Sequence, residues 1–138
     1  MSNTSKLFFI MAFTILACSC NRHVVSSSKV GDWNSIELSK STITFSKKGG
    51  TATVEAKNYT SWWINNICIT GTDNYYYADP GNDRSFLSAK GDGISARIGD
   101  RKNTVIITVD PSSGEKRSWD VNMQAGNAFT CIHVIQKR

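Results

Sequence analysis

The 138-residue chain lacks most of the features on which common functions depend. It has only two prolines and two histidines, and nothing matches a Gly-rich phosphate loop, a zinc-ligand spacing or a nucleophile elbow. No segment reaches the roughly 20 consecutive apolar residues of a membrane-spanning helix. We therefore predict a protein that is not an enzyme, with no catalytic residue, no bound metal and no cofactor. The 40% apolar content is enough for one globular domain.

The net charge of +5 also lacks a concentrated source. The basic residues occur as separate pairs at predicted turns or at the terminus: Lys47-Lys48, Arg101-Lys102, Lys116-Arg117 and Lys137-Arg138. Nucleic-acid binding proteins usually gather their basic residues on one face. We predict no nucleic-acid partner.

The N-terminus has the organisation of a secretory signal. Residues 1–6 are polar and positively charged, and residues 7–17 are apolar apart from Thr14, a run too short to span a bilayer. The sequence Ile15-Leu16-Ala17-Cys18 resembles the lipobox of bacterial lipoproteins, in which the cysteine is lipidated and becomes the first residue after cleavage. An ordinary signal peptide is the alternative, and Cys20 is a weaker lipidation candidate. We predict a signal peptide at residues 1–17 and lipidation of Cys18.

A Ser-rich segment without periodicity follows, and it predicts a tether at residues 18–34 before a domain at residues 35–138. A flexible tether of this length holds the domain about 20 Å from its anchor. We expect an outer-membrane lipoprotein of the cell envelope, held to its membrane by lipid. Bacterial lipoproteins of this kind are often displayed on the cell surface when acidic residues follow the lipidated cysteine. None follows Cys18 closely, so the sequence leaves open whether the protein faces the periplasm or the cell surface.

The last third of the chain gives the clearest structural signal. Three runs of alternating or β-branched apolar residues, separated by DPSSGE and AGN, predict strands at 104–109, 118–125 and 129–136. Alternation places one set of side chains on a buried face: Val105, Ile107, Val109, Trp119, Val121, Met123, Ala125, Ile132 and Val134. It places Ser118, Asp120, Asn122 and Gln124 on the solvent face. This is the pattern of antiparallel sheets with one buried side.

Earlier segments continue the pattern. We predict strands near 36–39, 42–46, 51–57 and 61–69, with one or two more around 75–77 and 85–89. Gly49-Gly50 supplies the positive φ angles of a tight hairpin. The prediction is an all-β sandwich of about seven to eight antiparallel strands.

Several short motifs together resemble the BACON domain family (Bacteroidetes-associated carbohydrate-binding, often N-terminal). The residues that carry the resemblance are Ile43-Thr44-Phe45, Gly49-Gly50, Thr51-Ala52-Thr53-Val54, Ser61-Trp62, Ser113-Gly114-Glu115-Lys116-Arg117 and Val134-Ile135-Gln136. The match covers roughly Ser35 to Gln136. It implies an immunoglobulin-like arrangement of two packed sheets and carbohydrate binding. Family members often precede a catalytic domain, whereas this chain ends directly after its last predicted strand, so we expect a stand-alone lipoprotein.

That arrangement has a consequence for Cys68 and Cys131. In an immunoglobulin-like order, the strands that carry them flank the penultimate strand, so their backbones lie about 10 Å apart. This separation exceeds the span of a disulfide, and we predict free, largely buried thiols. His133, two residues from Cys131, is interpreted as a half-buried strand residue and not as part of a catalytic or metal site.

The candidate ligand-binding residues are aromatic and polar side chains in the middle of the chain: Trp63, Tyr75, Tyr77, Asn82 and Arg84. Aromatic faces stack on the C–H faces of sugars, and amide and guanidinium groups bond their hydroxyls. Alternation puts Trp62 and Ile64 on one face, and the resemblance implies that this face is in the core, so Trp63 is expected to point outward. Alternation also places Tyr75 and Tyr77 opposite to Tyr76. Packing or loop support is the alternative role for the aromatic residues, and calcium binding by the loop from Asp73 to Asp83 is a less favoured one.

Two function hypotheses follow from these observations. The first is a lipid-anchored module that binds carbohydrate, such as a polysaccharide or a mucin glycan. The second is a non-catalytic structural or assembly module of the envelope, with a protein partner and no glycan ligand.

Overall fold

The computed structural model describes residues 34–138, which contain nine β-strands and no helix. The strands are β1 (Thr42–Phe45), β2 (Gly50–Glu55), β3 (Trp63–Ile69), β4 (Tyr75–Tyr77), β5 (Ser88–Gly91), β6 (Ile94–Ile98), β7 (Thr104–Val109), β8 (Arg117–Ala125) and β9 (Ala128–Gln136). The predicted signal peptide, Cys18 and the tether lie outside the described residues, apart from the tether's last residue.

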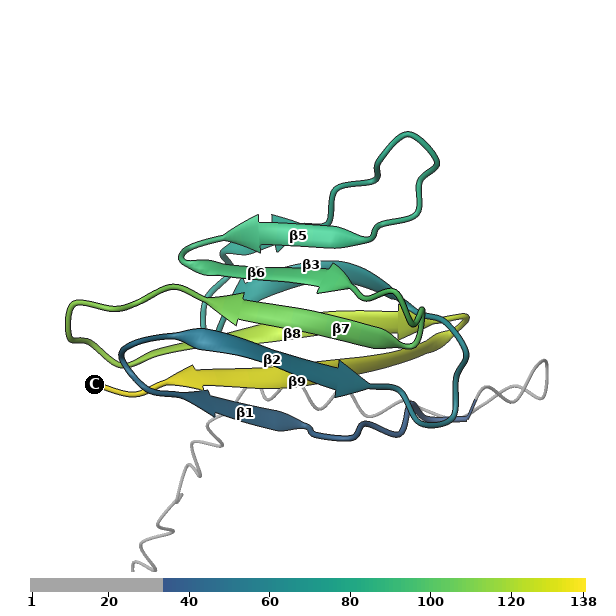
Figure 1. Cartoon of the computed structure of the whole chain (residues 1–138). Helices are drawn as coiled ribbons and strands as arrows, with labels where there is room; N and C mark the ends of the chain where they lie inside the picture. Colours follow the sequence, from purple (N-terminus) through teal and green to yellow (C-terminus); the bar gives the residue numbers. More distant parts are fainter. Residues whose placement is uncertain (1–33) are drawn as a thin grey trace, which may run out of the picture.

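The strands form two sheets that lie face to face (Figure 1). One sheet has five strands in the order β1-β9-β8-β3-β4, and the other has four in the order β2-β7-β6-β5. The chain is therefore an all-β protein with the two-layer architecture of a β-sandwich. Across residues 34–138, no helix is long and apolar enough to cross a membrane.

The core fills the space between the two sheets, and alternation determines which residues enter it. One cluster of buried apolar residues draws on both sheets, including Ile43, Phe45, Val54, Ile64, Ile67, Ile94, Ile107, Trp119, Val121, Met123, Ile132 and Val134. The predicted inward faces of β7, β8 and β9 are confirmed, because every predicted inward residue of these strands is buried. Each fully buried Val, Ile or Met side chain contributes about 1.5 to 3 kcal/mol by leaving water.

A β-bulge in β3 allows its irregular apolar pattern to fit one sheet. The sequence WINNICI has isoleucines three residues apart, at Ile64 and Ile67, which strict alternation would place on opposite faces. The register against β8 shifts between Ile64 and Asn66, and both isoleucines are fully buried. The extra residue thereby keeps Ile67 in the core and turns Asn66 and Cys68 to the same outer face as Trp63.

Three details of the predicted fold are wrong. Residues 36–39 form a single bridge, Leu38 to Ala56, and not a strand. Gly49 and Gly50 have positive φ angles as predicted, at 70° and 150°, but they do not close a hairpin. Instead β1 pairs with β9 and β2 pairs with β7, so the link between β1 and β2 crosses from one sheet to the other. Alternation and turn residues specify strands, but they do not specify partners.

The third error concerns the number and direction of strands. The described residues hold nine strands instead of seven to eight, because Ile94–Ile98 forms β6 between two glycine-containing turns. The pair of β1 and β9 is parallel, whereas all other strand pairs are antiparallel. The predicted hairpin across Gly126-Asn127 and the sheet crossing through DPSSGE are confirmed.

One buried amide holds two of the links between the sheets together. Gln136 at the end of β9 is fully buried, and its Oε1 accepts hydrogen bonds from Arg117 Nε and Nη2 at 3.0 and 2.6 Å. Its Nε2 donates to the carbonyl oxygens of Ser46, Lys47 and Asp110 at 3.3, 3.4 and 2.9 Å. These carbonyls belong to the β1–β2 and β7–β8 links, so a single side chain fixes both.

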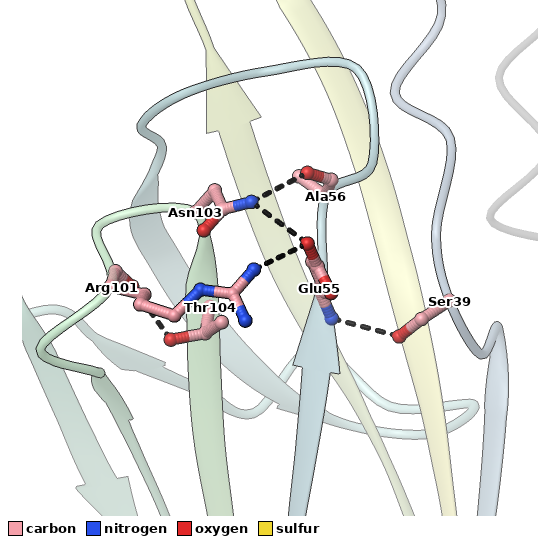
Figure 2. A network of polar contacts seen from close by, with 6 residues as sticks. All are labelled: Ser39, Glu55, Ala56, Arg101, Asn103 and Thr104. Carbon is pink, nitrogen blue, oxygen red and sulfur yellow. Dashed lines mark hydrogen bonds and ion pairs between the residues drawn. The ribbon is translucent and has the colours of Figure 1, made fainter.

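The opposite end of the sandwich has a second polar network (Figure 2). Glu55 Oε1 accepts hydrogen bonds from Arg101 at 2.7 Å and from Asn103 at 3.2 Å. Asn103 also donates to the Ala56 carbonyl, and the Glu55 amide donates to Ser39 Oγ. The network ties the β6–β7 turn to the end of β2 and to the segment before β1.

The Gln136→Leu substitution tests the role of the buried amide. It keeps roughly the side-chain volume but removes the five hydrogen bonds of a fully buried amide, two of them with the Arg117 guanidinium, so we expect a loss of about 2 to 3 kcal/mol in the free energy of unfolding. Urea denaturation measures the loss. The control is Gln124→Leu on β8, which is half exposed and should change the free energy by less than about 1 kcal/mol. Equal effects of the two substitutions would contradict the assignment.

Candidate ligand-binding face

The outer surface of the five-stranded sheet carries a group of aromatic and amide side chains. We call it the aromatic face, and its residues are Trp63, Asn66, Tyr75, Tyr77, Asn122, Gln124 and Phe129. They come from four adjacent strands, β4, β3, β8 and β9. The sheet register, and not the sequence, brings them together.

Two rows of paired residues cross these strands. In one row, Gln124 of β8 lies between Trp63 of β3 and Phe129 of β9. In the other, Asn66 of β3 pairs with Tyr77 of β4 and with Asn122 of β8. Each row spans about 10 Å from first to last residue, since adjacent strands lie about 4.8 Å apart.

The amide side chains at the centre of the face are held in place. Asn122 Nδ2 donates to Asn66 Oδ1 at 2.7 Å, and Gln124 Nε2 donates to the Gly126 carbonyl at 2.8 Å. Each amide keeps further donor or acceptor capacity, because a carboxamide carries two N–H donors and an oxygen with two lone pairs. The face therefore presents ordered polar groups between aromatic rings.

The aromatic residues of this face are unusually exposed. The exposed fractions are 44% for Tyr75, 74% for Tyr77 and 61% for Phe129, and no other aromatic residue in the described chain is classed as exposed. The rings of Tyr75 and Tyr77 stack with centroids 6.1 Å apart. Gathering three exposed aromatic residues on one sheet face is typical of a binding surface.

The structure groups three of the five predicted ligand residues. Trp63 is half-buried on the outer face, and Tyr75 and Tyr77 lie on the adjacent strand. Trp62 packs inward as predicted, and Tyr76 lies opposite to Tyr75 and Tyr77, as predicted, against the core. Trp62 is 3% exposed.

Asn82 and Arg84 are not part of the aromatic face. They lie in the loop between β4 and β5, which projects away from the two sheets (Figure 1). A backbone hydrogen bond from Asp79 to Ser88 closes the base of this loop. Within the loop, the Arg84 backbone adopts a left-handed conformation, with a φ of 55°. Proximity in sequence grouped these two residues with the tyrosines, but the loop carries them off the sheet.

Four residues of the aromatic face were not predicted as ligand candidates: Asn66, Asn122, Gln124 and Phe129. Alternation already placed Asn122 and Gln124 on the solvent side of β8. Their closeness to Trp63 depends on the register of β3 against β8, including the bulge. A repeated pattern of exposed amides was therefore the only signal available in the sequence.

A row of ionisable residues lies next to the two rows of the face. It contains Tyr75, Cys68, Asp120 and His133, one from each of β4, β3, β8 and β9. Asp120 was predicted to face solvent, and this is wrong in part: it points outward, in register with Cys68 and His133 of the neighbouring strands, but is only 5% exposed. Its Oδ1 lies 2.6 Å from His133 Nδ1.

The arrangement around Cys68 disfavours its thiolate. Burial raises the pKa of the Cys68 thiol, and the negative charge of Asp120 raises it further. A nucleophilic cysteine needs a neighbouring histidine or cation that lowers its pKa, whereas here the carboxylate stands between Cys68 and His133. Cys68 and Cys131 lie on strands that flank β8, as predicted, and no disulfide joins them.

The loop aspartates have local structural roles. Asp79 Oδ1 accepts from the Gly81 amide at 2.9 Å, and Asp83 Oδ1 accepts from the Ser85 amide at 3.1 Å. Hydrogen bonding to Ser85 lowers the pKa of Asp83. Aspartates commonly stabilise turns in this way. Within residues 34–138, no cluster of three or more His, Cys, Asp or Glu side chains is placed to hold a metal ion.

The Asp120→Asn substitution tests the electrostatics of the ionisable row. Removing the carboxylate charge favours the thiolate, so the pKa of Cys68 should fall and its alkylation by iodoacetamide at pH 8 should accelerate. Peptide mass spectrometry after timed quenching measures the rate at Cys68. Asp73→Asn is the control, because Asp73 raises the same pKa less than Asp120 does. A rate that rises equally in both variants, or falls in Asp120→Asn, would contradict the expectation.

Comparison with known proteins gives a structural likeness only. No family model and no curated protein matches the chain. A protein from Bacteroides thetaiotaomicron, solved by NMR, superposes with a TM-score of 0.55 at 21% sequence identity, covering 81% of this chain and 94% of that one. At this identity the likeness shows that the two proteins share a fold.

Proposed function

We propose that the chain is a non-catalytic, lipid-anchored module of the cell envelope whose aromatic face binds carbohydrate. The observation that carries the proposal is the gathering of Trp63, Tyr75, Tyr77 and Phe129 around the ordered amides of Asn66, Asn122 and Gln124.

The chemistry of the face suits a sugar. Pyranose rings present C–H groups that pack on aromatic rings, and hydroxyls that need directed donors and acceptors. On this face the aromatic rings lie at the edges and the amides in the middle. The 10 Å length of each row exceeds one pyranose ring, so the face suits an oligosaccharide that runs across the strands.

The absence of charged groups from the aromatic face indicates a neutral glycan. Asp120 and His133 lie in the neighbouring row, where they bond each other. A low net charge at the centre of the face favours ligands that are recognised through hydroxyl groups.

Membership of the BACON family, with an immunoglobulin-like strand arrangement, is part of this proposal. The support for membership is that motifs far apart in the sequence lie close together in the fold. Gly49-Gly50, Arg117 and Gln136 belong to three of the matching segments. Gln136 bonds Arg117, and it also bonds the carbonyls of Ser46 and Lys47 in the link that Gly49 closes. Motifs that act as one structural unit are expected to occur together.

A structural or assembly role in the envelope is the second candidate. Its support is the stack of Tyr75 and Tyr77 on β4, an edge strand of three residues. Exposed tyrosines at a sheet edge also suit a protein partner, since tyrosine is enriched at protein interfaces. In this reading the partner would occupy the surface that we assign to a glycan.

A glycan array followed by affinity gels tests carbohydrate binding. We expect retention on at least one neutral glycan, and we expect Trp63→Ala and Phe129→Ala each to weaken binding about tenfold or more, because each removes a stacking surface. Leu87→Ala is the matched control, since Leu87 is exposed but lies off the aromatic face. Absence of retention on every glycan would disprove the proposal and favour the assembly role.

Replacement of Cys18 tests the lipid anchor. The Cys18→Ala variant should lose incorporation of labelled palmitate and move from the membrane fraction to the soluble fraction, because no other group would hold the domain at the bilayer. Cys20→Ala should behave like the unchanged protein. Continued labelling of the Cys18→Ala variant would disprove lipidation at this residue.

A further inference from the structure

We propose that the outer face of the four-stranded sheet holds a second binding site, which takes the anionic group of an acidic saccharide. The site is a shallow depression of about 230 Å³ over β5, β6 and β7. It lies on the sheet opposite to the aromatic face and does not depend on the proposed binding of a neutral glycan there.

The depression results from the sizes of the side chains on this face. Its polar and apolar walls come from Ser88, Lys90, Ser95, Arg97, Ile106 and Thr108. The register pairs Ser88 with Arg97 and Lys90 with Ser95, so each long cationic side chain stands opposite a short hydroxyl side chain. The short serine side chains leave the depression open, and the longer side chains of Lys90, Arg97 and Ile106 form its border.

The two cations of this site are close to each other and lack anionic partners. Lys90 and Arg97 occupy diagonal positions on neighbouring strands, where Cα atoms lie about 7 to 8 Å apart. Neither forms an ion pair with any residue of 34–138. In contrast, Arg101 is bonded to Glu55, and Arg117 is bonded to Gln136. An oxyanion placed between Lys90 and Arg97 would relieve their mutual repulsion.

Hydroxyl groups extend the site toward β2. Ser95 pairs with Thr108, and Thr108 in turn pairs with Thr51, whose hydroxyl lies 3.1 Å from that of Thr108. Hydroxyls both donate and accept hydrogen bonds, as the hydroxyls of a sugar do. A ligand that places an anionic group at Lys90 and Arg97 and several hydroxyls along the row of Ser95, Thr108 and Thr51 would be an acidic saccharide.

A lipid surface fits the site less well. The only large apolar side chain that lines the depression is Ile106, and it is half-buried. Membrane-binding surfaces combine basic residues with exposed apolar ones that enter the bilayer. The observations therefore favour a saccharide over an anionic membrane.

The experiment compares galacturonic acid with galactose, which differ in the carboxylate at C6, on the purified ¹⁵N-labelled full chain. We expect galacturonic acid to shift the amide signals of Ser88, Ser95 and Thr108, and galactose to leave them unchanged. Arg97→Gln and Lys90→Gln should each weaken the binding about tenfold or more, since each removes a charge-assisted hydrogen bond. Both residues are exposed, and the spectrum itself reports whether each variant is folded.

Lys40→Gln is the matched control, because it removes one exposed positive charge outside the site. Equal weakening by Lys40→Gln would show non-specific attraction of anions and overturn the proposal. Equal shifts with galactose would overturn the role of the charge. Sedimentation with phosphatidylglycerol vesicles, lost in Arg97→Gln and without any shift by galacturonic acid, would assign the site to a membrane and overturn the saccharide. Binding that survives Trp63→Ala would separate this site from the aromatic face.

Discussion

The hydrogen bonds of one buried carboxamide fix how the two sheets are connected. Both the β1–β2 link and the β7–β8 link leave one sheet and enter the other, and each brings backbone carbonyls within hydrogen-bond distance of this side chain. Gln136 donates to the carbonyls of Ser46, Lys47 and Asp110, while Arg117 satisfies its oxygen. A typical hydrogen bond contributes about 0.5 to 1.5 kcal/mol, so this group of bonds is a sizeable part of the stability of a domain of this size.

Further contacts extend this arrangement to the β5–β6 turn. The Arg117 guanidinium lies 5.0 Å from the centre of the Trp119 ring, and Trp119 Nε1 donates to Asp92 at 3.1 Å. A Cβ atom on Gly93 would lie 2.7 Å from Arg117 Nη1, so the glycine makes room for the guanidinium. Gly49 has a similar role, because a Cβ there would lie 2.1 Å from the Val109 carbonyl oxygen. The glycines of this end thus serve close packing as well as backbone conformation.

The rigid interior leaves the two outer faces free to differ in chemistry. The five-stranded sheet presents aromatic rings and amides, and the four-stranded sheet presents hydroxyls and two cations without anionic partners. The first set suits the hydroxyls and C–H faces of a neutral glycan, and the second suits an anionic group. In the five-stranded sheet, the carboxylate of Asp120 lies between Cys68 and His133. A cysteine and a histidine, which act together in catalysis in other proteins, are thus kept apart here. Both proposals therefore concern binding and not catalysis.

The sequence by itself determined the strands and their faces, because burial follows a two-residue period that can be read directly from the chain. It separated Trp62 from Trp63 and Tyr76 from Tyr75 and Tyr77, and it predicted the hairpin at Gly126-Asn127. It could not give the partners of β1 and β2, because alternation carries no information about which strand lies beside another. Nor could it show that Asp120 is covered.

Only the tertiary structure decided which residues share a site. Phe129 and Trp63 are far apart in the chain, and they lie in one row because each pairs with Gln124. Asn82 and Arg84 are close to the tyrosines in sequence, and the loop between β4 and β5 takes them away. The bulge in β3 is the clearest case, since one inserted residue decides whether Asn66 or Ile67 faces outward. Sheet register is set by the packing of the whole core, and so it becomes visible only when the chain is folded.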